Sequence, residues 1–195
     1  MQETIQKDSL IGKRITKLDA PEKAGGKTRY IQDLDVQGQL YGKILRSARV
    51  HAKIKSIDTS AAKALSGVHA VITAADVPWQ RPIGVSKDHL PLKSDRVRSL
   101  RDEVAAVAAI DADVAAEALS LIRVDYEPLP AVFTMTDAMK PDALQIHAKS
   151  KGNVAWAQSR DLGDVDAAFA DSAHVRTDRY TTPASHNCYA EFHAV

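Results

Sequence analysis

The run of seven small apolar residues at 104–110 constrains the fold more than any other feature of this chain. An unbroken apolar run of this length is typical of a strand that is buried on both faces. Asp111 or Asp113 can cap a helix directly after it, because an aspartate side chain accepts hydrogen bonds from the free amides of a first helical turn. The apolar residues that then share one helical face are Val114, Ala118, Leu121 and Ile122. The sequence therefore predicts a buried strand followed by an amphipathic helix.

The other apolar segments before residue 131 are short and alternate with polar residues, which is typical of strands. Asp58-Thr59-Ser60 can cap a short helix at 61–65, and the aperiodic, proline-containing region 79–95 is expected to be a long surface loop. The expected strands are 28–33, 40–46, 52–57, 68–73 and 123–126. Strands with two interspersed helices and no internal repeat predict an α+β fold.

Hydrophobic order is lost at 132–162, which we interpret as a linker. Beyond it, Asp164 can cap a helix at 165–170, and 175–182 alternates like a strand. A last alternating segment, 188–195, runs to the final residue with no turn or polar tail after it. We therefore expect the chain to be a fragment of a longer protein.

Length and composition exclude several classes of protein. A chain of 195 residues accommodates one domain and part of another. Its net charge of +1 and its aromatic content of 5% do not favour a nucleic-acid-binding surface. Neither a signal-peptide core nor an apolar stretch of about 18 residues is found, so we expect no membrane partner and a cytoplasmic location. The single cysteine, Cys188, can form neither an internal disulfide nor an iron–sulfur site by itself.

Residues near the C-terminus form the one cluster of metal-ligand types, namely His186, Glu191 and His193. Glu191 and His193 would share one face of a strand, but two ligands without a third favour a solvated or interfacial strand face over a metal site. Cys188 lies two residues from His186 and could be a nucleophile only with an activating base; a small buried side chain is the favoured interpretation.

Two further patterns have ordinary structural explanations. Gly25-Gly26-Lys27-Thr28 lacks the upstream glycine and the preceding strand of a phosphate-binding loop, so it is interpreted as a flexible connector. The carboxylate pairs Asp102-Glu103 and Asp125/Glu127 flank expected strands, where exposed acidic residues are common. No group of residues has the spacing of a complete active site. We therefore assign no catalytic, cofactor-binding or metal-binding residue to this chain.

An ordered series of segments, taken together, resembles the molybdopterin-binding large subunits of the xanthine dehydrogenase / aldehyde oxidase family. The series consists of 14–23, Gly26-Lys27, Tyr30, Asp33, 40–47, 51–54, 58–60, 67–78, 103–111, 116–119, 122–126, Leu129-Pro130, Ile146-His147, Gly152-Asn153, 163–165 and His186 with Glu191. Within the family, 82–85, 90–92 and 95–98 look most like the 4-hydroxybenzoyl-CoA reductase branch. The resemblance implies an N-terminal arm at 1–27, an α/β hammerhead domain at 28–131, a linker at 132–162 and the truncated start of a molybdopterin-binding domain at 163–195.

The resemblance implies that the full-length parent is a molybdenum-dependent oxidoreductase of aromatic, N-heterocyclic, aldehyde or aryl-CoA substrates. Its molybdopterin would be held by loops beyond Val195, with [2Fe–2S] clusters and FAD on partner subunits, so this fragment would be structural, hold no cofactor and be inactive alone. Its partners would be the rest of the large subunit, the iron–sulfur subunit and the FAD subunit, with homodimerisation also considered. The alternative is a self-standing, non-catalytic binding or assembly module with the hammerhead fold.

Overall fold

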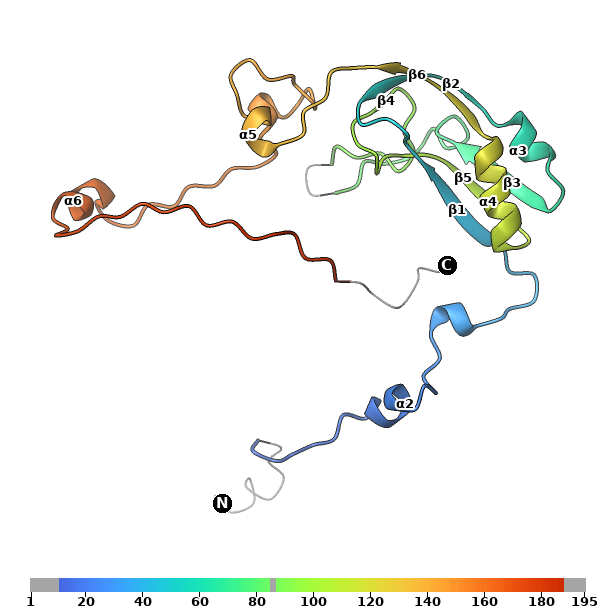
Figure 1. Cartoon of the computed structure of the whole chain (residues 1–195), viewed down its shortest axis with the longest axis horizontal. Helices are drawn as coiled ribbons and strands as arrows, with labels where there is room; N and C mark the ends of the chain where they lie inside the picture. Colours follow the sequence, from blue (N-terminus) through green and yellow to red (C-terminus); the bar gives the residue numbers. More distant parts are fainter. Residues whose placement is uncertain (1–10, 85–86, 188–195) are drawn as a thin grey trace. The chain divides into compact units, whose positions relative to one another are not determined.

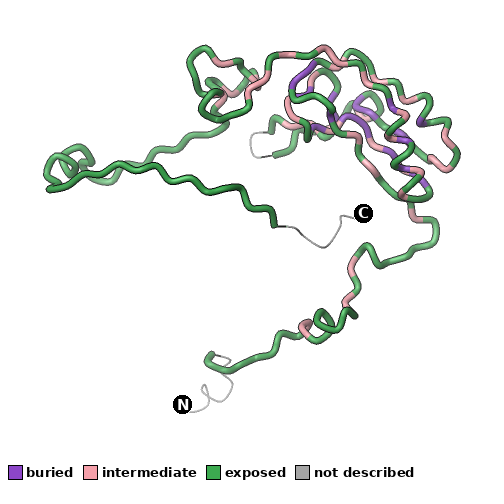
Figure 2. Tube along the Cα trace, in the orientation of Figure 1, coloured by how far each residue is buried: buried purple, intermediate pink, exposed green. Residues whose placement is uncertain are grey.

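The computed structural model describes residues 11–84 and 87–187, and the chain divides into two units. One unit is Gln39–Thr177 and contains both β-sheets (Figure 1). The other combines Met1–Gly38 with Asp178–Val195; its described part contains the short helix α2 (Ala20–Ala24) and the 3-10 turn η1 (Ile31–Asp33). The buried residues of the described chain all lie in the first unit (Figure 2).

The first sheet is antiparallel, with strand order β1-β5-β3. Its strands are β1 (Tyr41–Arg46), β5 (Glu103–Ala109) and β3 (Val68–Thr73). Helix α4 (Ala112–Leu121) packs against all three strands, and α3 (Ser60–Ala64) packs against both β3 and α4. The central position of β5 confirms that the apolar run is a core strand.

The start of α4 confirms the aspartate cap. Asp111 accepts hydrogen bonds from the backbone amides of Asp113 at 2.9 Å and Val114 at 2.7 Å. Ala118 and the following Ile122 are buried in the core, as their spacing predicted, while Val114 and Leu121 are partly buried against it. The helix and β5 are therefore joined by a turn whose amides Asp111 satisfies.

The second sheet is also antiparallel, with strand order β4-β2-β6. Its strands are β4 (Arg96–Val97), β2 (Ala52–Asp58) and β6 (Arg123–Pro128). One buried cluster lies between the first sheet and its two helices, and a second consists of Ala52, Val97 and Val104. Ile57 and Val124 pack against both clusters, so the two sheets are joined through one continuous apolar core. Two antiparallel sheets, with α3 and α4 packed against the first of them, confirm the α+β class.

Two expected strands are wrong. Region 28–33 contains η1 instead, because the Asp33 carboxylate accepts from the Tyr30 amide at 2.8 Å and closes a tight turn. No residue of 175–182 is in a strand, and all of them are exposed. Alternation alone does not form a strand, because a strand needs a neighbour to accept and donate its backbone hydrogen bonds. The last expected strand, 188–195, lies outside the described residues.

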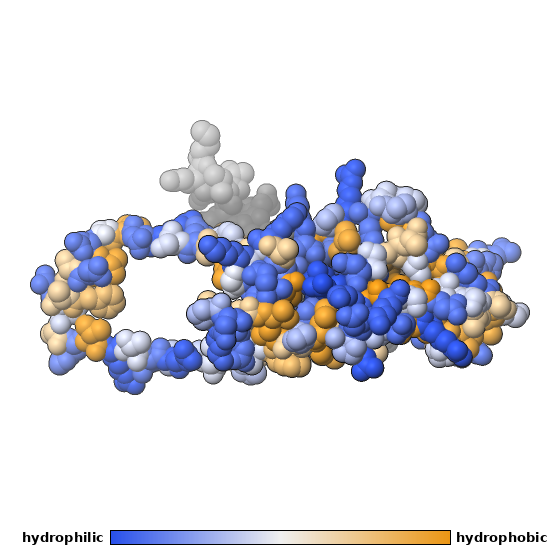
Figure 3. Space-filling model, turned by 90° about the horizontal axis from the view of Figure 1, so that it is seen from above, coloured by the Kyte–Doolittle hydropathy of each residue, from blue (hydrophilic) through white to orange (hydrophobic). Residues whose placement is uncertain are grey.

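The segment interpreted as a linker contains α5 (Met135–Ala138) and the 3-10 turn η2 (Lys151–Asn153). Beyond it, α6 (Val165–Ala170) begins after Asp164, as predicted, with the Asp164 side chain accepting from the Ala167 amide at 2.9 Å. Every residue from 154 to 187 is nevertheless exposed. Hydrophobic residues lie beside charged ones on the surface (Figure 3). Within the described ranges, no helix has the length and apolar character needed to cross a bilayer.

Candidate functional site

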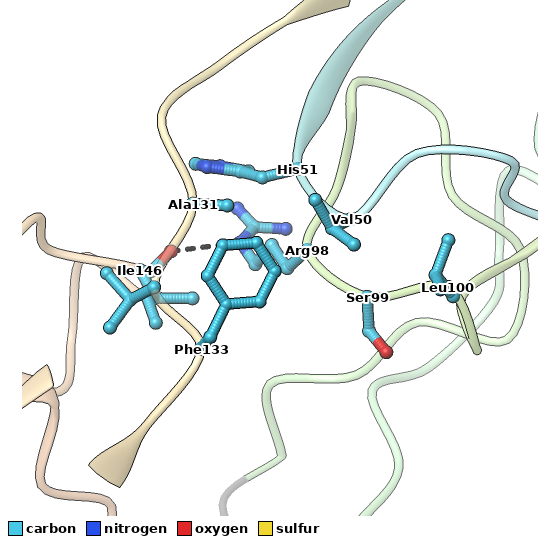
Figure 4. A pocket seen from close by; sticks show the side chains of 9 residues that line it. Val50, His51, Arg98, Ser99, Leu100, Ala131, Phe133 and Ile146 are labelled. Atoms are coloured by element: carbon cyan, nitrogen blue, oxygen red, sulfur yellow. Dashed lines mark hydrogen bonds between the residues drawn. The ribbon is translucent and has the colours of Figure 1, made fainter. Parts of the chain in front are cut away.

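A cavity of about 240 Å³ lies between the start of β2, the chain just after β4 and the segment after β6 (Figure 4). Apolar side chains form much of its wall, and three polar side chains, from His51, Arg98 and Ser99, also line it. The apolar contributors named in Figure 4 are Val50, Leu100, Ala131, Phe133 and Ile146. The cavity is therefore an apolar hollow with a few polar groups, which is the usual composition of a binding site.

His51 is the buried polar residue of this cavity, with 6% of its surface exposed. Its Nδ1 lies 2.5 Å from the carbonyl oxygen of Pro130. Because a carbonyl can only accept, Nδ1 carries the hydrogen and donates it. In the neutral ring, Nε2 is then an acceptor, and it is buried with no hydrogen-bond partner among the described residues.

Arg98 connects the cavity to the segment after β6. Its Nε donates to the carbonyl oxygen of Ile146 at 2.9 Å, drawn as a dashed line in Figure 4. The surrounding loop is held by the amide of Asn153, whose Oδ1 accepts from the Ile146 amide at 2.8 Å. Its Nδ2 donates to the carbonyl oxygens of Ala138 and Leu144. One asparagine therefore organises the loop that supplies a wall of the cavity.

These groups can bind and orient a ligand but show no arrangement for bond-making chemistry. A guanidinium, a hydroxyl and an imidazole acceptor offer polar contacts, and no carboxylate or thiol of the described residues lines the cavity. Nucleophilic catalysis by Ser99 would need a base within hydrogen-bond reach, and in the described structure His51 hydrogen-bonds to the Pro130 carbonyl and not to Ser99. The geometry therefore supports recognition or packing at this cavity.

A second polar group, which we name the charge cluster, lies at one end of β5 and comprises Arg46, His89, Lys93, Asp102 and Glu103. Lys93 and Asp102 are each 5% exposed, and Lys93 Nζ lies 3.7 Å from Asp102 Oδ1. Glu103 accepts from Arg46 Nη1 at 2.9 Å and lies 3.1 Å from His89 Nε2. Burial raises the pKa of Glu103, whereas its own backbone amide, Arg46 and His89 lower it. The lowering effects together outweigh burial, so the pKa of Glu103 lies below its usual value.

The structure corrects one interpretation of the acidic pairs. The expectation of an exposed acidic end is wrong for Asp102, because Lys93 lies beside it and the surrounding chain buries both side chains. At the other pair, Asp125 is exposed, and Glu127 is partly exposed and accepts from Lys53 Nζ at 3.0 Å. Sequence inspection missed Lys93 because its partner follows nine residues later, beyond a loop without periodicity.

The remaining candidates are not brought together into a site. Gly25 and Gly26 follow the end of α2, and Gly26 has φ +65°, so this segment terminates a helix instead of preceding one, as expected for a connector. His186 is exposed, whereas Cys188, Glu191 and His193 lie outside the described residues. Within 11–84 and 87–187, no group of three His, Cys, Asp or Glu side chains could hold a metal ion.

Comparison with known proteins gives a consistent picture. Residues 25–130 match the family model described as aldehyde oxidase and xanthine dehydrogenase, a/b hammerhead domain. The chain is 37% identical over 174 residues to the nicotinate dehydrogenase large molybdopterin subunit of Eubacterium barkeri, covering 89% of this chain and 40% of that protein. It is 38% identical over 174 residues to a probable xanthine dehydrogenase subunit of Bacillus subtilis, covering 89% of this chain and 23% of that protein.

Solved structures with the same fold are much longer than this chain. A crystal structure of a Cu,Mo-CO dehydrogenase is 42% identical with a TM-score of 0.63, covering 68% of this chain and 17% of that one. The aldehyde oxidoreductase of Desulfovibrio gigas is 30% identical with a TM-score of 0.63, covering 71% of this chain and 17% of that one. The chain therefore spans less than half the length of each of these relatives.

Proposed function

We propose that this chain forms the N-terminal part of the large subunit of a molybdenum-dependent oxidoreductase. The proposal proceeds from its family, because the chain belongs to the aldehyde oxidase and xanthine dehydrogenase family through its hammerhead domain. The observation that carries this proposal is the continuous match of 89% of the chain to only 40% and 23% of two family members. The chain would contribute structure, while the remainder of such a subunit would carry the catalytic centre.

The proposed domain layout is an arm at 1–27, the hammerhead domain at 28–131, a linker at 132–162 and the start of a molybdopterin-binding domain at 163–195. The family match at 25–130 supports the hammerhead limits. The absence of buried residues between 154 and 187 supports a later segment that belongs to a different core. Each of these features fits a chain that combines one complete domain with part of another.

The described residues do not fit a molybdopterin site. The cavity beside His51 has no glycine in its lining, and the described residues provide no three-ligand metal cluster. We propose that the remainder of the subunit holds the molybdopterin, and we assign no step of the chemistry to this chain. Two of the relatives named above carry molybdenum or molybdopterin in their names, the nicotinate dehydrogenase large molybdopterin subunit and the Cu,Mo-CO dehydrogenase, and [2Fe–2S] and FAD subunits are the proposed partners.

The 4-hydroxybenzoyl-CoA reductase branch would require an aryl-CoA substrate, and the nicotinate and xanthine dehydrogenase relatives favour N-heterocyclic substrates instead. A cytoplasmic location is proposed from the composition. The self-standing module predicts that the isolated chain is a folded, monodisperse protein, and sedimentation of the isolated chain measures this property. A homodimer is a further proposed assembly.

A chimera tests the proposal. This chain replaces the matching N-terminal part of the Bacillus subtilis protein, and the product is expressed with that enzyme's other subunits. We expect molybdenum content and xanthine oxidation well above those of a large subunit that lacks its N-terminal part. A folded chimera with no more molybdenum than the deletion would contradict the proposal, and stoichiometric molybdenum in the isolated chain would overturn the structural role.

A further inference from the structure

Strand β5 is apolar on both faces; the helices cover one of them, and on the other face Val104 is buried beside the second sheet while the residues that follow it there are not. The antiparallel register places Ala106 between Ile44 of β1 and Ile72 of β3. It also places Ala108 between Gly42 and Ala70. Neighbours in register share a face, and that face alternates with the one that Val107 presents to the helices. We name these six residues, Gly42, Ile44, Ala70, Ile72, Ala106 and Ala108, the open face.

Exposure confirms that the two faces differ. On the helix side, Val107 is 2% and Val71 is 4% exposed. On the open face, Ile44 is 48% and Ile72 is 37% exposed, and none of the six residues is buried. The second sheet also packs against this sheet, through Ile57 and Val124 and around Val104 of β5, but none of the six open-face residues belongs to either buried cluster of the described chain.

The composition of the open face is that of a buried surface. An antiparallel sheet with one solvated face normally carries polar residues on that face. Here all six residues are apolar, and four of them are glycine or alanine, which allow another backbone to approach closely. Such a face is stabilised when a second apolar layer removes it from water.

We propose that the open face is the docking surface for the remainder of the large subunit, an inference that rests on the proposed function. Most of the length of each relative lies outside the part that this chain matches, so a large tethered partner follows from the proposed assignment. The absence of charge on the open face calls for an apolar segment of that partner.

The size of the open face favours a tethered partner over a second copy of this chain. Strands about 4.8 Å apart and about three residues long give a footprint on the order of 150 Å² for this three-stranded sheet. Two copies meeting there would bury roughly 300 Å², far below the roughly 1,200 Å² of a stable interface. A segment of the same polypeptide needs less area, because the covalent link supplies a high effective concentration.

Matched variants of the chimera described above test the docking surface. Ile44→Asp and Ala70→Asp place a carboxylate on the open face, and Ala116→Asp places one on the exposed side of α4 as a control. In the isolated chain, all three variants should unfold at urea midpoints close to that of the unaltered chain. In the chimera, the two open-face variants should lose molybdenum and be cleaved by protease about tenfold faster, because a buried unpaired charge opposes docking. The control should leave both unchanged.

The outcomes separate the two proposals. Failure of the unaltered chimera to hold molybdenum refutes the proposed function. If the unaltered chimera holds molybdenum and both open-face variants match the control, the docking proposal is overturned while the function stands. If the isolated chain dimerises and Ile44→Asp alone abolishes the dimer without affecting the chimera, the open face joins two copies and the docking proposal is again overturned.

Discussion

Replacing Asp102 with alanine should be among the most destabilising single changes in the charge cluster. The Asp102 side chain accepts from the Arg98 amide at 2.6 Å and lies 3.7 Å from the ammonium of Lys93. Lys93 and Asp102 are both 5% exposed, so the variant would leave the partly buried Arg98 amide without its acceptor and a buried cation without its nearest carboxylate. Removing one partner of a buried ion pair costs about 3–5 kcal/mol of the free energy of unfolding.

We expect a loss near the lower end of that range, because Glu103 Oε2 remains 4.0 Å from the Lys93 ammonium. With a slope of about 1.5 kcal/mol per molar urea, a loss of about 3 kcal/mol lowers the unfolding midpoint by about 2 M. Equilibrium urea unfolding, followed by circular dichroism, measures this shift.

The double variant Asp102→Ala with Lys93→Met is the matched control. The double variant removes the unpaired Lys93 cation as well as the Asp102 carboxylate. The urea midpoint should therefore regain about half of the loss caused by Asp102→Ala alone, because a buried methionine needs no ionic partner. A single Asp102→Ala midpoint within about 0.3 M of the unaltered chain, on the order of 0.5 kcal/mol, would refute the reasoning. So would a double variant no more stable than the single one, because the cost would then not come from the buried cation.

Three further predictions concern the first sheet and its helices, namely the cap of α4, the glycine before β3 and the first residue of β5. Asp111→Ala removes the cap of α4 and should lower the free energy of unfolding by about 1 kcal/mol in urea, while Asp111→Asn, which keeps the acceptor, should change it little. Gly67→Ala should destabilise more than Gly38→Ala in thermal unfolding: the two glycines have φ +86° and +80°, but only at Gly67 would the added Cβ meet a side-chain carbon, at 2.8 Å. The pKa of Glu103 is lowered on folding, so its ionised form stabilises the fold above its usual pKa, and that contribution is lost as the pH falls through the lowered value. Urea midpoints between about pH 7 and about pH 3 should therefore fall less steeply for Glu103→Gln than for the unaltered chain, and equal slopes would contradict this assignment.

The parts of the fold that sequence predicted are those set by local pattern. The 104–110 run, the Asp111 cap and the spacing of Ala118 and Ile122 were sufficient to predict β5 and α4, because each signal acts within a few residues. The incorrect strand at 175–182 alternates like the short strands that were predicted correctly, but no described strand pairs with it.

The polar sites required information that local pattern does not contain. His51 is positioned by the carbonyl of Pro130, 79 residues later, and the Arg98 side chain by that of Ile146, 48 residues later. Lys93 lies in a region whose irregularity indicated only a surface loop, although its side chain is buried. Such contacts depend on how the two sheets and the loop meet in three dimensions, so side-chain type and spacing alone could not identify them.

The prediction that β5 is buried on both faces remains informative, although among the described residues the second face is buried only at Val104 and not at Ala106 and Ala108. On the helix side of β5, Ala105 and Ala109 are 0% exposed. On the other side, Ala106 and Ala108 are only partly buried. If the sheet were selected only for the contacts seen here, nothing would favour alanine and isoleucine over polar residues on the open face. The exposed segment 154–187 independently presents apolar residues without a core, including Trp156 at 73% exposure. The proposed docking of the remainder of a large subunit would explain both features through one apolar layer, so open-face substitutions should act on the chimera and spare the isolated chain.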